Sequence, residues 1–159
     1  MAKTQYVGKA GQLAIMGELA FRGYNVAIPE MDVGDDVFVV NDDTAQLWRL
    51  QVKTSQPTQQ SASVVYQFSL RKDQLTSASS NIDLTYVFVM RSLASKTSWW
   101  NYVIIPRPAL DALYKQQGFQ SDGDKMNVRL VVNDDETVKW KVTDLSKYYN
   151  NVDEIFPAI

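Results

Sequence analysis

Two strand-forming runs separated by a short turn place the strongest constraint on the fold of this chain. The first run covers residues 35–40, DDVFVV, the second covers residues 47–55, LWRLQVKTS, and the turn-rich sequence NDDTAQ joins them. Apolar and β-branched runs bounded by Asn and Asp are typical of a β-hairpin. Because alternate side chains of a strand point to opposite faces, Gln51 and Lys53 share one face and Val52 lies on the other.

A helix is expected before this hairpin, and further strands and helices after it. Residues 8–24, GKAGQLAIMGELAFRGY, repeat apolar side chains with the period of a helix, and Gly23 is suited to end it. Strands are expected at 25–28, 64–70, 83–92, 98–106, 127–132 and 137–142, helices at 71–79, 107–118 and 145–156, and a loop at 56–63. The pattern predicts an α/β or α+β fold with a mixed sheet flanked by helices.

The residue types that the sequence lacks limit the groups available for catalysis and metal binding. The chain has 159 residues, 45% of them hydrophobic, which predicts one domain over 1–159 that buries its own core. It has neither cysteine nor histidine, so disulfides, thiolate metal sites, cysteine nucleophiles and an imidazole base are excluded. Catalysis would have to use carboxylates, amides, lysine, hydroxyls or a hard cation held by oxygen, such as Mg²⁺, Mn²⁺ or Ca²⁺.

Charge and hydropathy give further expectations about partners and location. The formal net charge of −2 lowers the expectation of a nucleic-acid binder, although a local basic face is compatible with it. The chain does not open with a charged segment followed by an apolar run, and no apolar segment reaches the roughly 18 residues of a membrane span. We therefore expect a cytoplasmic protein without a membrane partner.

The hairpin carries an aspartate opposite its polar pair. Asp36 on one strand and Gln51 on the other can hold a hard cation between carboxylate and amide oxygens, with the Lys53 ammonium beside it. Such a lysine can orient or deprotonate an attacking water, or stabilise charge on a phosphate. Each motif also has an ordinary structural interpretation, as a turn aspartate and as the exposed face of a half-solvated sheet. Together they suit phosphodiester hydrolysis.

In this order, the helix, the hairpin aspartate and the downstream Gln-x-Lys resemble the PD-(D/E)XK nuclease superfamily over residues 8–55. The similarity is to its resolvase-like and intron-homing-endonuclease-like branches, some of which have glutamine in the last motif. The resemblance implies a restriction-endonuclease-like core, extended here by a C-terminal hairpin and helix. It also implies that Asp36 binds Mg²⁺ or Mn²⁺, that Gln51 is the second metal-associated residue and that Lys53 is the active-site lysine.

The helix departs from the family pattern at its acidic position. Alignment on Gly-Tyr puts Gln12 where the family has glutamate, and Glu18 follows six residues later. Gln12 falls at the centre of the apolar stripe, whereas Glu18 lies about 120° away and can pair with Arg22 at i+4. We expect Gln12 to face the site, with a shifted helix that brings in Glu18 as the alternative. Asp32 and Asp35 are weaker candidates than Asp36 for the metal-binding aspartate.

Two functions follow from this resemblance. The first is a metal-dependent DNA endonuclease that acts as a homodimer, with RNA left open as a substrate. The second is a catalytically inactive nuclease-like fold that serves as a DNA-binding or assembly component of a mobile element or defence system. Asp36 and Lys53 favour the first function. Gln12 and Gln51 favour the second, because each replaces a carboxylate and lowers the attraction for a dication.

Overall fold

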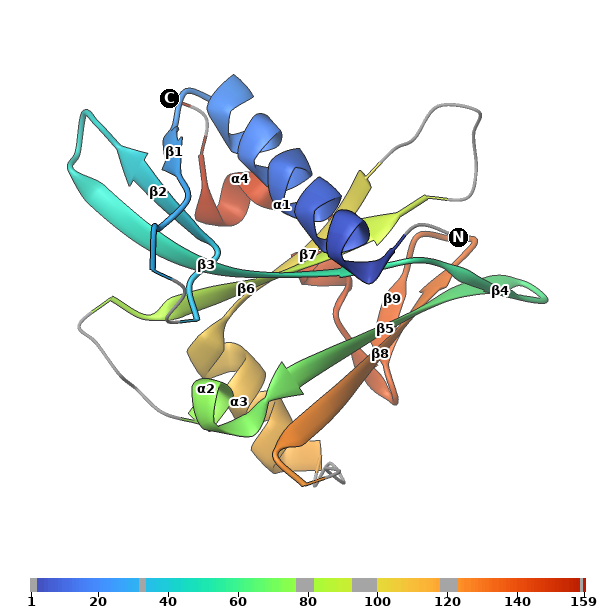
Figure 1. Cartoon of the computed structure of the whole chain (residues 1–159). Helices are drawn as coiled ribbons and strands as arrows, with labels where there is room; N and C mark the ends of the chain where they lie inside the picture. The colour runs from blue at the N-terminus through green and yellow to red at the C-terminus, as the bar shows by residue number, and fades with distance from the viewer. Residues whose placement is uncertain (1–2, 32–33, 77–81, 93–99, 118–122, 158) are drawn as a thin grey trace.

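The computed structural model describes residues 3–31, 34–76, 82–92, 100–117, 123–157 and 159, and its strands form two five-stranded sheets (Figure 1). The first sheet has the strand order β1-β2-β3-β6-β7, with β1 (Asn25–Ala27), β2 (Val37–Asn41), β3 (Gln46–Ser55), β6 (Leu84–Arg91) and β7 (Trp100–Pro106). Within it β3 and β6 run parallel and the other neighbours antiparallel, so the sheet is mixed, as predicted.

The second sheet is antiparallel and has the strand order β10-β9-β8-β5-β4. Its strands are β4 (Thr58–Gln60), β5 (Ser63–Arg71), β8 (Lys125–Asn133), β9 (Val138–Trp140) and β10 (Thr143–Asp144). The expected C-terminal hairpin is present as β8 and β9, but it pairs with β5 rather than extending the first sheet. The expectation of a loop at 56–63 is wrong in part, because β4 lies within it and pairs with β5.

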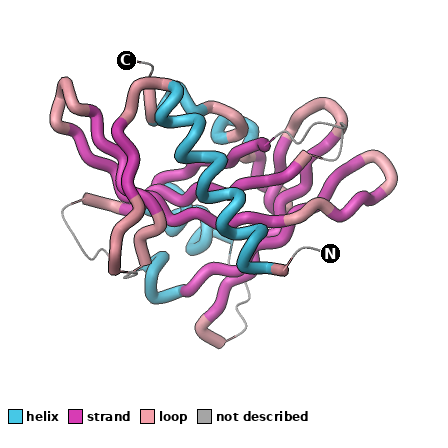
Figure 2. Tube along the Cα trace, turned by 45° about the horizontal axis from the view of Figure 1, so that its top comes forward, coloured by secondary structure: helices cyan, strands magenta, loops and turns pink. Residues whose placement is uncertain are grey.

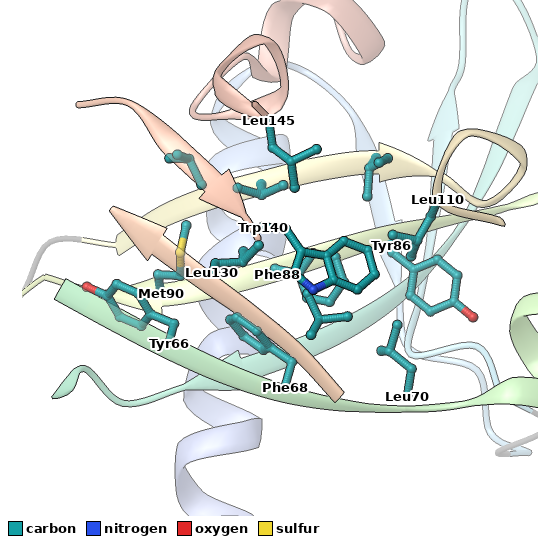
Figure 3. Close-up of a cluster of buried hydrophobic side chains, with 14 of the residues drawn as sticks. Tyr66, Phe68, Leu70, Tyr86, Phe88, Met90, Leu110, Leu130, Trp140 and Leu145 are labelled. Carbon is teal, nitrogen blue, oxygen red and sulfur yellow. The ribbon is translucent and has the colours of Figure 1, made fainter. Parts of the chain in front are cut away.

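Helices and the second sheet cover the two faces of the first sheet (Figures 1 and 2). On one face, α1 (Thr4–Phe21) and α4 (Val152–Ile155) pack on an apolar cluster that includes Leu19, Leu50 and Val52. On the other face, α2 (Lys72–Thr76), α3 (Arg107–Gln117) and the second sheet enclose a larger cluster. Figure 3 shows this cluster, in which side chains from both sheets surround Trp140. Both faces of β6 are buried, which explains its continuous apolar sequence. None of the helices in the described ranges has the length and hydropathy needed to cross a bilayer.

The single helix expected at 145–156 is wrong. The segment consists of a 3₁₀ turn, η1 (Ser146–Tyr148), and the short helix α4, with Asn150 at φ 50° between them. The Asn150 backbone N–H donates to the Tyr102 carbonyl oxygen at 2.8 Å, and the Tyr102 N–H donates to Asn150 Oδ1 at 2.8 Å. These bonds attach the segment to β7 and satisfy edge groups that a continuous helix would leave unpaired.

Candidate functional site

Asp36 lies immediately before β2, and hydrogen bonds from β3 fix its carboxylate. The Asp36 backbone N–H donates to the Leu50 carbonyl oxygen at 2.8 Å. Asp36 Oδ2 accepts the Val52 backbone N–H at 2.7 Å and also accepts a hydrogen bond from Gln51 Nε2. Hydrogen bonds to an ionised carboxylate are stronger than those between neutral groups. The hairpin therefore brings Asp36 and Gln51 together, as the alternation of its strands predicted.

Gln51 is 4% exposed and connects Asp36 to a third polar side chain, Gln74. Gln74 Nε2 donates to Gln51 Oε1 at 2.5 Å and to the Gly34 carbonyl oxygen at 2.6 Å. Because a carboxylate only accepts hydrogen bonds, Gln51 must turn its NH₂ group to Asp36 and its oxygen to Gln74. Sequence reasoning missed Gln74, which lies on the short helix α2, and no motif spacing relates it to the hairpin.

Gly34 makes room for the Gln74 amide. Its φ of 102° is a backbone conformation that residues with a side chain rarely adopt, and a Cβ at this position would overlap Gln74 Nε2. A glycine directly before two aspartates is the one local sign in the sequence that the backbone turns sharply here. The turn directs the chain into β2, with Asp36 next to β3.

Lys53 lies on the same side of β3 as Gln51, two residues further along. In the parallel register Gln51 is opposite Tyr86 of β6, and Lys53 is opposite Phe88. The side chain of Val52 between them packs in the apolar cluster beneath α1. Lys53 is only partly buried. The polar pair thus shares one face, as the strand alternation predicts.

Close packing between α1 and β3 determines which helix residue reaches the hairpin. Gly11 is buried against Thr54, and a Cβ at Gly11 would lie 2.9 Å from Thr54 Cβ and 2.7 Å from its Cγ2. The next residue, Gln12, donates from Nε2 to the Asp36 carbonyl oxygen at 2.5 Å. Lys9 Nζ donates to Gln12 Oε1 at 2.9 Å. Gln12 therefore faces the hairpin, as the helical periodicity predicted.

Glu18 makes its contacts elsewhere. Its carboxylate accepts a hydrogen bond from Arg22 Nε at 2.8 Å, the expected i+4 pair, and Arg22 also contacts Asp153 of α4. These contacts involve the C-terminal part of α1 and α4, whereas Gln12 contacts the hairpin from the N-terminal part. The shifted helix that would bring Glu18 to Asp36 is not observed.

Asp35 forms a buried ion pair. Its carboxylate accepts bonds from Arg49 Nε at 3.1 Å and from Arg49 Nη2 at 2.9 Å, and its side chain is 3% exposed. Because the guanidinium occupies both oxygens, Asp35 serves to fix the start of β2 against β3. Asp32 lies outside the described residues.

The candidate site is therefore one carboxylate held by a backbone N–H and the Gln51 amide, with Lys53 on the same side of β3 as Gln51. Among the described residues no three His, Cys, Asp or Glu side chains gather in a way that could hold a metal ion. The Asp36 carboxylate is the hard oxygen donor at this position that Mg²⁺ and Mn²⁺ prefer, whereas Gln51 directs its NH₂ group to Asp36 and its oxygen to Gln74.

Comparison with known proteins shows the fold. No model of a protein family matches the sequence, and no curated protein matches it. The structure is similar to that of a bacterial homing endonuclease, I-Ssp6803I, with a TM-score of 0.55 and 16% sequence identity, over 98% of this chain and 93% of that one. The chain accordingly has a nuclease-like α+β fold, with two sheets flanked by helices.

Proposed function

We propose that this protein is a metal-dependent endonuclease that hydrolyses phosphodiester bonds in DNA. The observation that carries the proposal is the hydrogen bond between Gln51 and Asp36 in a nuclease-like fold, with Lys53 two residues further along β3 on the same side as Gln51. The resemblance of residues 8–55 to the PD-(D/E)XK superfamily assigns roles to the same three residues.

The donor set fits a divalent cation that binds few protein ligands. Mg²⁺ is commonly held by one or two carboxylates together with water and substrate phosphate oxygens, so Asp36 would supply the carboxylate. Gln51 would add its amide oxygen only after turning its amide and releasing Gln74. Bound there, Mg²⁺ or Mn²⁺ would supply Lewis-acid polarisation of the scissile phosphate. With a single carboxylate, we expect weak cation affinity before DNA binds.

The protein's own groups orient and stabilise the reacting atoms. Lys53 offers an ammonium that can hold the attacking water or stabilise the charge that develops on the phosphate. Val52 N–H and the Gln51 amide keep the Asp36 carboxylate in place, and Gln74 keeps the Gln51 amide in place. Gln12 connects α1 to the same strand start. Cutting both strands of a duplex requires two such sites, so we propose a homodimer.

The test is cleavage of supercoiled plasmid, linear duplex and four-way-junction DNA with Mg²⁺ or Mn²⁺. We expect cutting by the parent and by Lys115→Ala, which removes an exposed lysine on α3, and at least 100-fold slower cutting by Asp36→Ala and Lys53→Ala. Circular dichroism of each variant verifies that it is folded. Undiminished cutting by folded Lys53→Ala would contradict the assigned site.

A catalytically inactive DNA-binding or assembly component is the second candidate, and the amide network favours it. Gln51 donates to the Asp36 carboxylate and accepts from Gln74 with its oxygen, and Gln12 binds only the Asp36 backbone carbonyl oxygen, so no second carboxylate takes part in this network. This candidate predicts that the parent cuts none of the substrates and that calorimetry detects no Mn²⁺ binding with or without duplex DNA.

A further inference from the structure

The second sheet has an outward surface with a composition unlike that of the whole chain. From Tyr66 to Arg71 of β5 and from Lys125 to Leu130 of β8, alternate residues are buried in the core and the residues between them are exposed. We define the outer face as these exposed side chains together with Lys139 of β9: Gln67, Ser69, Arg71, Lys125, Asn127, Arg129 and Lys139. The register sets Gln67 opposite Arg129, Ser69 opposite Asn127, and Arg71 opposite Lys125.

The strands that form this surface contain cations but no carboxylates. β4, β5, β8 and β9 have four Lys or Arg and no Asp or Glu, whereas the whole chain has 16 Lys and Arg against 18 Asp and Glu. Acidic residues lie at the strand ends, where Asp124 directly precedes Lys125 and acts electrostatically on Arg71. Arg71 pairs with Asp73, and Lys139 is opposite Asp144 of β10.

Lys125 and Arg129 are the cations of the outer face that form no ion pair within the described residues. Arg129 Nη2 donates to Gln60 Oε1 at 3.0 Å, a neutral partner on β4. Lys125 lies directly opposite Arg71 in the strand register, and the Arg71 guanidinium pairs with Asp73. A hollow of about 400 Å³ lies beside Arg129, and Gln67, Ser69 and Asn127 are among its lining residues.

We propose that the outer face binds the sugar-phosphate backbone of duplex DNA, through Lys125 and Arg129 as the principal contacts. Lys and Arg, with Ser, Asn and Gln as hydrogen-bonding neighbours, are the side chains that contact phosphates in protein–DNA complexes. The inference rests on the proposed function in taking DNA as the ligand. β5 continues directly into α2, which carries Gln74 to the candidate site, so the outer face and the site are joined by one segment.

The test measures binding separately from cleavage. Fluorescence anisotropy with a labelled 30-base-pair duplex in EDTA, at NaCl concentrations from 50 to 300 mM, compares the parent with Lys125→Gln/Arg129→Gln. The control is Lys115→Gln/Lys147→Gln, which removes two exposed cations from α3 and η1. We expect the double variant of the outer face to bind about tenfold more weakly at 100 mM NaCl. Its slope of log K against log salt should be shallower by about 2, one phosphate for each cation. The control should match the parent.

The outcomes separate this inference from the proposed endonuclease. Equal affinity and equal salt slope for the two double variants would overturn the outer face as a DNA surface, even if the parent cuts DNA. Weaker binding confined to the outer-face variant supports the inference, even if the parent cuts nothing. If sedimentation shows that this variant changes the oligomeric state while DNA binding is unchanged, the face is a contact between copies of the chain, and the inference is wrong.

Discussion

Gly11 provides the most direct test of how the helix is positioned over the candidate site. Gly11→Ala adds a methyl group that would lie 2.9 Å from Thr54 Cβ and 2.7 Å from Thr54 Cγ2. Rotation of Thr54 about χ1 cannot relieve the overlap, because its Cβ is itself too close. The helix α1 must therefore move away from β3, and Gln12 moves with it from the Asp36 carbonyl oxygen.

The magnitude follows from comparison with Gly17, where nothing lies within 4 Å of an added Cβ. Replacing a glycine in an exposed helix interior by alanine stabilises by about 1 kcal/mol, and both variants share this term. Overpacking at a close contact costs about 1–3 kcal/mol, and only Gly11→Ala incurs it. Gly17→Ala should thus raise the melting temperature by about 2–4 °C. The free energy of unfolding of Gly11→Ala should be lower than that of Gly17→Ala by about 1–3 kcal/mol.

The assay is urea denaturation of four proteins: the parent, Gly17→Ala, Gly11→Ala and Gly11→Ala/Thr54→Ala. Thr54 Oγ1, Cγ2 and Cβ are the three atoms nearest to the added methyl group, and Thr54→Ala removes the first two. We therefore expect the double variant to recover part of the loss and to show a coupling energy above about 0.5 kcal/mol. A Gly11→Ala variant as stable as Gly17→Ala would refute the close approach of α1 and β3. Plasmid cleavage by Gly11→Ala, if the parent cuts, should fall at the same time.

Three further predictions concern stability, the amide network and pH. Asp35→Ala leaves the guanidinium of Arg49 without its buried partner and should cost about 3 kcal/mol in urea denaturation, and an unchanged midpoint would contradict this. Gln74→Ala frees the Gln51 amide, so we expect cleavage to fall about tenfold while anisotropy shows unchanged DNA affinity; loss of both would indicate unfolding instead. Burial raises the pKa of Tyr66 to about 12, so the unfolding free energy should fall as the pH rises from about 10, where the unfolded tyrosine ionises, to 12. Tyr66→Phe should lose less between pH 9 and pH 11, measured by urea denaturation.

Local periodicity was sufficient to predict the core of the candidate site. The alternation of a strand puts Gln51 and Lys53 on one face, and the turn between the two runs brings Asp36 to Gln51. The period of a helix likewise separates Gln12, which contacts the hairpin, from Glu18, which contacts Arg22. These relations hold because each depends on residues within one element or one hairpin. The catalytic roles of these residues remain predictions.

The sequence was sufficient to predict the fold class, but not how the strands divide between two sheets. The helix, the first hairpin and the buried strand β6 follow from hydrophobic patterns that a single element can display. The separation of the strands into two sheets depends on which segments pair across the chain, and β5 pairs with β8 some sixty residues later. The C-terminal segment is broken because its backbone groups pair with β7, a partner that no local pattern shows.

The sequence by itself determined which functional groups are available, and cysteine and histidine are not among them. It also determined the faces on which Asp36, Gln51 and Lys53 lie, because side-chain direction has a fixed period in each element. Only the tertiary structure decided that Gln74 completes the site and that Gly11 sets the distance between α1 and β3. Contacts of this kind depend on how separate elements pack, to within a few tenths of an ångström, and that packing is a property of the whole folded chain.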